Sequence, residues 1–451
     1  MNIVIAGDGE VGAYLAKLLT GKDHNIFVID SHEKNLESIE SHNDLIAVEG
    51  DSTSIEVLKN ANVKNADLLI SVVHDEKVNI VTCILGKKMG ASKTIARVNN
   101  LEYFKDNCMD IFAGAGIDAI VCPERIAANE CIDLISHSAA TEVFDFSGKL
   151  LSLMLFHLDD KSKYLNKTIK EFMADDVAND YTIMAIARDN HNFIPKTSDV
   201  LKNGDYIYTL TKPRGKKSLI NAIGKDNQEI KNLMIVGGGR IGRMMASQLQ
   251  NTHNIKIIEK DIDRCNKLAS SLQNCLIING DSREVEMLED ENISGMDAFV
   301  AVTDNSETNI LTCMLAKRYG VNKVIALMDN VEYIDLAQRI GIDGILNKKL
   351  ITASYMTRYT LDADVSNIKC LNGIDAEILE IRAKKGSYIT KKAVGNLHLP
   401  EGIVIGGVIR EYESHIVTDD FQIRQDDKVV VLCFPDTVQD AIKLFNKQTL
   451  F

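Results

Sequence analysis

The chain has 451 residues, of which 45% are hydrophobic and 25% charged, and its formal net charge is −13. This length favours two to four globular domains, and the acidic balance argues against a nucleic-acid partner or a polybasic membrane anchor. No apolar run approaches the roughly 18 residues that a transmembrane helix needs, and Met1 leads directly into a predicted strand instead of a signal peptide. We therefore expect a cytoplasmic protein.

Short apolar runs alternate with amphipathic segments over the first part of the chain. Continuous apolar runs of this length predict strands buried on both faces of a parallel sheet, and the segments between them have helical periodicity. The predicted strands are 1–7, 25–30, 45–50, 66–73, 93–98 and 119–123, and the predicted helices are 11–20, 34–42, 55–61, 77–90 and 101–108.

The second half of the chain repeats this pattern. Gly237 lies 230 residues after Gly7, and Asn309 lies 230 residues after Asn79. Self-similarity at a fixed offset indicates a duplicated unit. The strands predicted in the second copy are 232–238, 254–260, 275–281, 297–303, 323–328 and 344–347.

Each copy begins with a G-x-G-x-x-G motif between a predicted strand and a predicted helix. The glycines are Gly7, Gly9 and Gly12 in the first copy and Gly237, Gly239 and Gly242 in the second. This context is typical of a Rossmann fold, in which the glycines allow a tight turn, close approach of a pyrophosphate and close helix–strand packing. The helix N-terminus then supplies free N–H groups to the phosphates.

Strand-like runs also follow each parallel-sheet part, at 149–158, 181–189 and 204–213 and again at 376–383, 402–411 and 426–435. They predict a small α+β domain after each Rossmann part, and the polar stretch 211–232 is the expected joint between the two units. We expect an α/β fold with internal duplication: two Rossmann-like, doubly wound parallel sheets, each followed by a small α+β domain. The predicted domains are 1–138, 139–222, 230–362 and 363–451.

A carboxylate follows the last motif glycine of each copy by 17 or 18 residues. Asp30 and Glu259 are therefore expected to accept hydrogen bonds from adenosine ribose hydroxyls, which favours NAD(H) or an adenine nucleotide over NADP(H). Gly-Asp-Ser follows the third strand of each copy, where an adenine would lie, and a helix N-cap is the structural alternative for its Asp or Ser. Asp75 and Asp304, after the fourth strands, are likewise candidates for helix N-caps.

The two copies differ in the charged residues around their loops. The first copy has Glu10 in the loop and Arg97 at the end of its fifth strand, where the second copy has Leu327. The second copy instead has Arg240 and Arg243 in the loop. Either arrangement of guanidinium groups suits phosphate oxygens, so the two sites are expected to differ in ligand or affinity.

Catalytic signatures are missing from the sequence. The histidines at 137, 157, 191, 253, 398 and 415 have no partner at the repeat offset, and the sequence contains no H-E-x-x-H, G-x-S-x-G, Walker A or Cys/His metal motif. We therefore expect no enzyme activity, no catalytic residues and no metal site, and instead nucleotide capture coupled to a conformational response. The alternatives are an NAD-dependent oxidoreductase and a nucleotide sensor for another transporter.

With its duplicated layout, the whole chain resembles the TrkA family of tandem RCK (or KTN) domain proteins. The resemblance is carried by GDGEVG at 7–12, GDS at 50–52, ARV at 96–98 and PE at 123–124, and in the second copy by GGGRIG at 237–242, GDS at 280–282 and VTDNSETN at 302–309. It implies a regulatory subunit, peripheral on the inner face of the cell membrane, that binds NAD(H) and ATP or ADP. It also implies a homo-oligomer, dimeric or a tetrameric ring, that docks on a TrkH-type potassium-translocating subunit.

The resemblance places the family's phosphate-facing arginine on Arg97 and its late carboxylate on Glu124, whose second-copy equivalents are Leu327 and Lys349. It also makes ERIAANECIDLISH and KKLITASYMTRYTL candidate dimer helices, although packing within the chain is an equal alternative. The predicted binding residues of the first copy are Gly7, Asp8, Gly9, Glu10, Val11, Gly12, Asp30, Gly50, Asp51, Ser52, Val73, His74, Arg97 and Glu124. Those of the second are Gly237, Gly238, Gly239, Arg240, Ile241, Gly242, Glu259, Gly280, Asp281, Ser282, Thr303 and Asp304.

Overall fold

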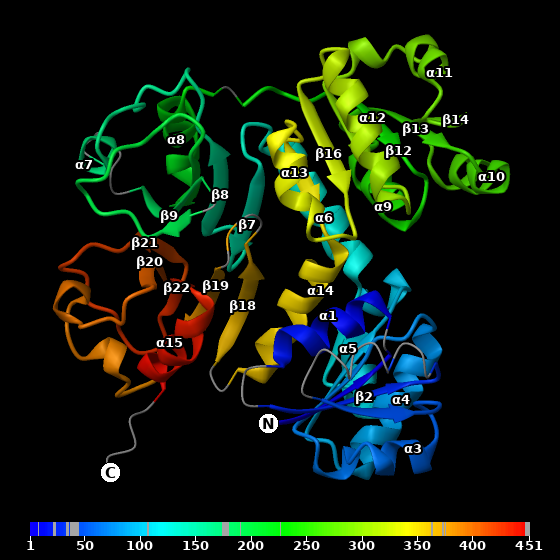
Figure 1. Ribbon diagram of the computed structural model, residues 1–451, viewed down its shortest axis with the longest axis vertical. Helices are drawn as coiled ribbons and strands as arrows, with labels where there is room; N and C mark the ends of the chain where they lie inside the picture. Colours follow the sequence, from blue (N-terminus) through cyan, green and yellow to red (C-terminus); the bar gives the residue numbers. More distant parts are fainter. Residues whose placement is uncertain are drawn as a thin grey trace. The chain divides into compact units, whose positions relative to one another are not determined.

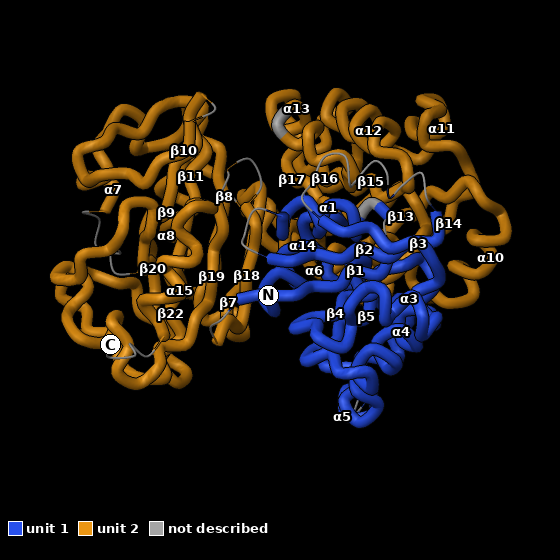
Figure 2. The backbone as a smooth tube through the Cα atoms, turned by 60° about the horizontal axis from the view of Figure 1, so that its bottom comes forward, with its two compact units in different colours: residues 1–126, 348–361 blue, residues 127–347, 362–451 orange. Residues whose placement is uncertain are grey.

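The computed structural model describes residues 1–7, 9–20, 24–32, 36, 45–105, 108–173, 180–189, 191–225, 227–361, 364–371, 374 and 376–446, without the side chains of Glu10 and Asp335. The chain forms two compact units, which Figure 2 colours separately. Unit 1 comprises residues 1–126 and 348–361, and unit 2 comprises residues 127–347 and 362–451. No helix in the described ranges is long and apolar enough to cross a membrane.

Unit 1 is built on a six-stranded parallel sheet with the order β3-β2-β1-β4-β5-β6, the Rossmann order (Figure 1). Its strands are β1 (Asn2–Ala6), β2 (Asn25–Asp30), β3 (Ile46–Glu49), β4 (Leu68–Ser71), β5 (Lys93–Arg97) and β6 (Ala119–Val121). Its helices are α1 (Glu10–Leu19), α3 (Ile55–Asn60), α4 (Glu76–Met89) and α5 (Cys108–Ala115). Short 3-10 turns lie at Val63–Asn65 and Leu101–Phe104.

Alternation along the strands gives this sheet two apolar faces. On one face, Ile3 and Ile5 of β1 pack with Leu15 of α1 and with Met356 of α14 (Lys348–Thr357). On the other face, Val4 packs with residues of α3 and the turn that follows it. Both faces are therefore covered, which is why the strands are continuous apolar runs.

Unit 2 contains a second parallel sheet of the same order, β14-β13-β12-β15-β16-β17. Its strands are β12 (Asn232–Val236), β13 (Asn254–Glu259), β14 (Cys275–Asn279), β15 (Ala298–Ala301), β16 (Lys323–Leu327) and β17 (Gly344–Leu346). Its helices are α9 (Arg240–Leu249), α10 (Ile262–Ser271), α11 (Val285–Asp290), α12 (Ser306–Arg318) and α13 (Tyr333–Arg339), with a 3-10 turn at Ile293–Gly295.

The helix that follows the last strand of each parallel sheet is assigned to the compact unit that contains the other parallel sheet. α14 follows β17 in sequence but packs on α1 in unit 1. α6 (Pro123–Ser136) follows β6, and from residue 127 onwards it belongs to unit 2. There Lys369 Nζ donates to Glu130 Oε1 on α6 at 2.7 Å, and Lys323 of β16 donates hydrogen bonds to the carbonyls of Ser138 and Ala140 just beyond the helix. Both candidate dimer helices therefore have packing partners within their own chain.

Two five-stranded antiparallel sheets complete unit 2, with the equivalent orders β7-β8-β11-β9-β10 and β18-β19-β22-β20-β21. The first comprises β7 (Glu142–Phe146), β8 (Leu151–His157), β9 (Tyr181–Arg188), β10 (His191–Phe193) and β11 (Tyr206–Thr211), with α7 (Ile169–Phe172), a 3-10 turn at Pro213–Gly215 and α8 (Lys216–Ile223). The second comprises β18 (Val365–Cys370), β19 (Glu377–Arg382), β20 (Ile403–Arg410), β21 (Glu413–Ile416) and β22 (Lys428–Cys433), with α15 (Val438–Phe445) and 3-10 turns at Tyr388–Thr390, Val394–Asn396 and Pro435–Thr437. A further 3-10 turn at Arg358–Thr360 follows α14 in unit 1.

Equivalent ion pairs show that the small domains are also duplicated. Arg188 forms a two-pronged pair with Asp205, and Arg410 forms one with Asp427. In each case a loop carbonyl accepts from the same guanidinium and a loop N–H donates to the same carboxylate. The two sheets also share one apolar core within unit 2.

The predicted fold class and internal duplication are confirmed. The single helix predicted at 101–108 is wrong in its type and extent. A 3-10 turn occupies Leu101–Phe104, and the α-helix begins only at Cys108. Asn100 accepts the N–H of Glu102 and starts that short turn. Apart from Leu36, the helix predicted at 34–42 lies outside the described residues.

Candidate functional site

The first glycine loop connects β1 to α1, and each of its glycines meets a different constraint. Gly7 has φ +104°, and a Cβ there would lie 2.8 Å from the backbone nitrogen of Val73. A Cβ on Gly12 would lie 1.8 Å from the carbonyl oxygen of Gly7, so only glycine allows the helix to start so close to the strand. Gly9, the N-cap of α1, faces open space, because a Cβ there would meet no described atom within 4 Å. The open side of Gly9 is thus where a phosphate group can approach N–H groups at the start of α1.

The rest of that loop is only partly described. Val11 is buried in the core beside α1. Asp8 and the side chain of Glu10 lie outside the described residues.

The second loop repeats this geometry between β12 and α9. Gly237 has φ +102°, a Cβ on Gly242 would lie 2.1 Å from the carbonyl oxygen of Gly237, and Gly239 again faces open space. Ile241 is buried, whereas Arg240 and Arg243 are exposed on the first turn of α9. The second loop therefore adds positive charge where the first has none at the same position.

The carboxylates that end the second strands both accept a hydrogen bond from the N–H two residues further on. In the first copy, Asp30 Oδ1 lies 2.9 Å from both the backbone nitrogen and Nδ1 of His32. In the second copy, Glu259 Oε2 accepts from the N–H of Gly238 at 2.9 Å, and Oε1 accepts from the N–H of Asp261. Glu259 is thus bonded across to its own glycine loop.

The Gly-Asp-Ser segments lie next to these carboxylates through backbone hydrogen bonds. The N–H of Gly50 donates to the carbonyl of Asp30 at 2.8 Å, and that of Gly280 donates to the carbonyl of Glu259 at 3.1 Å. Ser52 and Ser282 are buried. The structure therefore brings each segment to the same sheet edge as its ribose-binding candidate, at the carboxyl ends of the strands.

The two aspartates of these segments have different partners. Asp51 accepts from the N–H and hydroxyl of Thr53, and these hydrogen bonds hold its pKa below its usual range. Asp281 accepts from the guanidinium and N–H of Arg283, and also from Lys260, so its pKa is lowered further. Neither aspartate makes the N-cap hydrogen bond of the following helix, whose N-caps are Ser54 and Glu284.

A buried asparagine holds the ends of the fourth and fifth strands in each copy. Asn79 accepts from Ser71 Oγ and Val73 N, and donates to the carbonyls of Val73 and Arg97. Asn309 accepts from Thr303 N and Oγ1, and donates to the carbonyls of Thr303 and Leu327. The repeat offset had marked this pair in the sequence, but its role as a clamp only emerges from the structure.

These clamps fix the segments that follow the fourth strands, which contain further predicted binding residues. Val73 is half-buried and His74 exposed, and Thr303 and Asp304 have the same exposure pattern. Asp75 caps α4 by accepting from the N–H of Lys77, as anticipated. For α12 the cap is Asn305, not Asp304, because Asn305 accepts from the N–H of Thr308.

Arg97 and Glu124 come together in unit 1. Arg97 Nη2 lies 3.1 Å from Glu124 Oε1, and the two side chains are 18% and 9% exposed. Arg97 Nε has no hydrogen-bond partner among the described residues. In the second copy, Leu327 lies in unit 2 and Lys349 lies in α14 of unit 1.

Comparisons with known proteins agree with this duplicated architecture. The model of the TrkA-N domain matches residues 3–123 and again 233–348, and the model of the TrkA-C domain matches residues 378–446. The Trk system potassium uptake protein TrkA homolog 1 of Methanosarcina mazei is 31% identical over 99% of this chain and 100% of the relative. The Trk system potassium uptake protein TrkA of Haemophilus influenzae is 30% identical over the full length of both chains.

Solved structures with the same fold come from GsuK. The GsuK RCK domain aligns over 98% of this chain and 94% of its own, with a TM-score of 0.62 and 15% identity. The GsuK channel bound to NAD aligns over 98% of this chain and 78% of its own, with a TM-score of 0.62 and 15% identity. GsuK bound to ADP aligns over 79% and 68%, with a TM-score of 0.51 and 14% identity.

Proposed function

The chain belongs to the TrkA family of potassium uptake proteins, and from this membership we propose that it is a cytoplasmic, nucleotide-binding regulatory subunit. It docks on the inner face of the cell membrane, on a potassium-translocating subunit of the TrkH type, and controls potassium uptake through that partner. The observation that carries this proposal is that one chain has two G-x-G-x-x-G loops, each with an open approach at its middle glycine.

The residues around each loop fit an adenine nucleotide. NAD(H), ATP or ADP would place phosphates against Gly9 or Gly239, where a side chain is absent and space is open. Asp30 or Glu259 would hold the ribose, and the adenine would lie beside Gly50–Ser52 or Gly280–Ser282. The NAD-bound and ADP-bound GsuK structures, which have the same fold, support this choice of ligands.

The residues around the glycine loops favour a regulatory role over a catalytic one. A bound nicotinamide would supply hydride chemistry, but we propose that the groups near the strand ends hold strands, phosphates and ribose. His74, which follows β4, is exposed and has no equivalent in the second copy, where Asp304 stands. We therefore assign these residues to ligand binding, with the response transmitted by domain geometry.

Association of several copies is supported by apolar residues exposed at equivalent positions. Ile46 and Leu276 lie on the edge strands β3 and β14, and both are about half exposed. The pairs Ile55 and Val285, and Val81 and Leu311, are exposed in the same way. Single exposed apolar residues are ordinary, but retention of three pairs at one offset supports a dimer or ring built through the Rossmann domains.

The proposal is tested with tagged protein and detergent-solubilised native membranes. Pull-downs are compared without nucleotide and with NADH, ADP or ATP, using the parent chain, Asp30→Ala and the exposed control Glu229→Ala. We expect recovery of a polytopic potassium transporter, with a nucleotide dependence that Asp30→Ala alone reduces, and loss of potassium uptake when the gene is deleted. Unchanged potassium uptake in the deletion strain would contradict the proposal, as would turnover of NADH that Asp30→Ala abolishes.

A further inference from the structure

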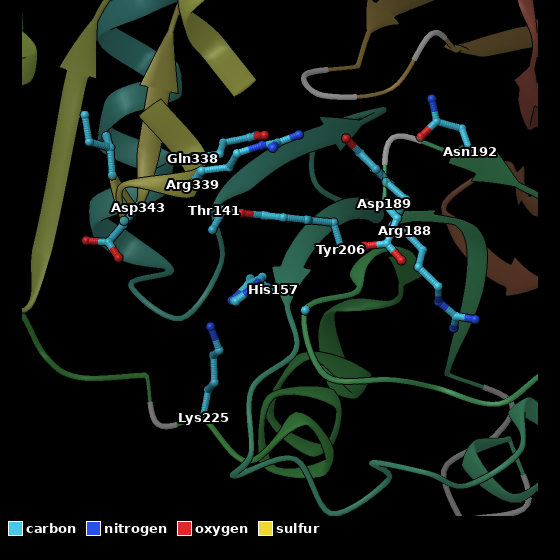
Figure 3. Close-up of a pocket in the computed structure, with 15 residues that line it drawn as sticks. Thr141, His157, Arg188, Asp189, Asn192, Tyr206, Lys225, Gln338, Arg339 and Asp343 are labelled. Carbon is cyan, nitrogen blue, oxygen red and sulfur yellow. The ribbon is translucent and has the colours of Figure 1, made fainter. Parts of the chain in front are cut away.

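Unit 2 contains a cavity of about 780 Å³ that is separate from both glycine loops. One side is formed by β8, β9 and β11 of the first antiparallel sheet, and the other by the end of α13 and the loop that follows it (Figure 3). Its volume is in the range of small-molecule sites, roughly 300–1,000 Å³. The residues that matter for its chemistry are His157, Arg188, Tyr206, Lys225, Arg339 and Asp343.

Two of the charged lining residues already have strong partners. Arg188 is bound by both carboxylate oxygens of Asp205, which is fully buried behind the strand. Asp343 lies 2.7 Å from Lys317 Nζ and also accepts the N–H of Val324. Asp343 raises the pKa of Lys225 from a distance but forms no ion pair with it among the described residues, and Asp189 is a second carboxylate on the lining.

Lys225 is different. Its side chain is partly buried, yet its ammonium makes no hydrogen bond or ion pair with any residue in the described part of the chain. Burial is the main reason that its pKa is lowered, and Asp159 and Asp343 only partly offset this effect from a distance. A partly buried ammonium without a close partner is costly, so this position favours an anion.

His157 lies beside that ammonium. Its ring centroid lies 4.7 Å from that of Tyr206, with the two ring planes tilted by 46°, and no described residue hydrogen-bonds its ring nitrogens. Its pKa is lowered first by burial and then by Lys225. In Figure 3 the side chain of Lys225 extends toward His157, and both face the cavity. The pair thus offers an ammonium and an imidazole ring beside the Tyr206 ring.

We propose that this cavity binds a small phosphate-bearing organic molecule, with the phosphate against Lys225 and His157 and the organic part against the Tyr206 ring. Lysine serves as a point charge for phosphate, and Arg339 adds positive charge at the exposed rim. Because strands of the small domain and the end of α13 both line the cavity, occupancy would link these two parts of unit 2. This would give the chain an effector site distinct from its nucleotide loops.

The first test is calorimetric titration with pyrophosphate as the probe. Lys225→Met is compared with Lys217→Met, an equal loss of charge at an exposed position of α8. We expect about tenfold weaker binding in Lys225→Met alone, since hydrogen bonds to charged groups are worth this much. Equal affinities in the two variants would overturn the proposal. His157→Gln replaces Lys225→Met if the latter does not fold, with weakened binding again expected.

Two further measurements separate this site from the nucleotide loops. NADH binding should be equal in Lys225→Met and Lys217→Met, so a failure of the proposed function and a failure of this inference are distinguishable. Lysine acylation read by mass spectrometry should show that pyrophosphate protects Lys225 and not Lys217; absence of protection would overturn the inference. Lys225-dependent binding of citrate that is as tight as that of pyrophosphate would overturn the assignment to phosphate.

Discussion

Around the glycine loops, the first Rossmann domain places Arg97 against Glu124, whereas the second has Leu327 at the position of Arg97. The second domain instead carries Arg240 in its loop. The groups that hold the strands do not differ in this way, because Asn79 and Asn309 each make four hydrogen bonds, three of them with equivalent backbone groups. The duplication has therefore kept the scaffold and changed the groups that would contact a ligand.

The largest effect is expected from Arg97→Leu, which gives the first copy the residue of the second. Glu124 is only 9% exposed, and removing the cation from a buried pair costs about 3–4 kcal/mol of stability. Hydrogen exchange of the β5 amides measures this loss locally. The control in the second copy is Leu327→Met, which conserves volume and should cost under about 1.5 kcal/mol.

The double variant Arg97→Leu, Glu124→Leu sharpens the same comparison. Replacing both partners by apolar groups should recover most of the loss, because no charge is then left buried alone. If Arg97→Leu is no more destabilising than Leu327→Met, the ion pair is not what distinguishes the two copies.

For the two asparagine clamps we expect equal losses of stability in the two copies. Asn79→Ala and Asn309→Ala should each cost about 2–3 kcal/mol, because each leaves buried backbone groups at two strand ends without partners. Exchange of amides in β4 and β5, and in β15 and β16, reads the two losses separately. A loss confined to one copy would break the claim of a common scaffold.

The sequence predicted this scaffold well because its signals are local. Strands such as β12 are continuous apolar runs, and Gly242 stands where a Cβ would collide with the carbonyl of Gly237. These constraints act within a few residues, so spacing alone reveals them. Asn79 and Asn309 were recognised as an equivalent pair because the repeat offset separates them.

Contacts between residues far apart in the sequence could not be predicted from such local signals. An apolar stripe indicated that 348–361 packs somewhere, but only the structure shows that Met356 joins the core around α1. The bond from Gly238 to Glu259 joins residues 21 apart, and nothing in their spacing predicts it. The binding roles of both carboxylates, and the predicted domain limits, stay predictions.

Asp30→Ala and Glu259→Ala test the two predicted ribose carboxylates separately. Asp30→Ala should weaken NADH binding by about 1.5–3 kcal/mol, the usual worth of hydrogen bonds to a charged group. Glu259→Ala should also destabilise its own domain, because the N–H groups of Gly238 and Asp261 lose their acceptor. Calorimetry with NADH and exchange of the β13 amides measure the two effects, with Glu229→Ala as the control. Unchanged affinity in Asp30→Ala would mean that the ribose lies elsewhere.

The smallest expected effect concerns Asp51 and Asp281, whose pKa values are both lowered in the folded chain. A carboxyl of this kind contributes stability above its unfolded pKa, about 3.9, and loses it as the pH falls through the folded value. Asp51→Asn and Asp281→Asn should each flatten the acid side of the stability profile below about pH 4, shifting the unfolding midpoint by at most about 2 °C. The salt dependence of stability distinguishes the two aspartates. The lowered pKa of Asp281 depends on the exposed guanidinium of Arg283, whereas that of Asp51 depends on the neutral groups of Thr53. Added salt should therefore shrink the effect of Asp281→Asn and leave that of Asp51→Asn unchanged. Equal salt sensitivity in thermal unfolding would show that the copies do not differ in charge pairing at this edge.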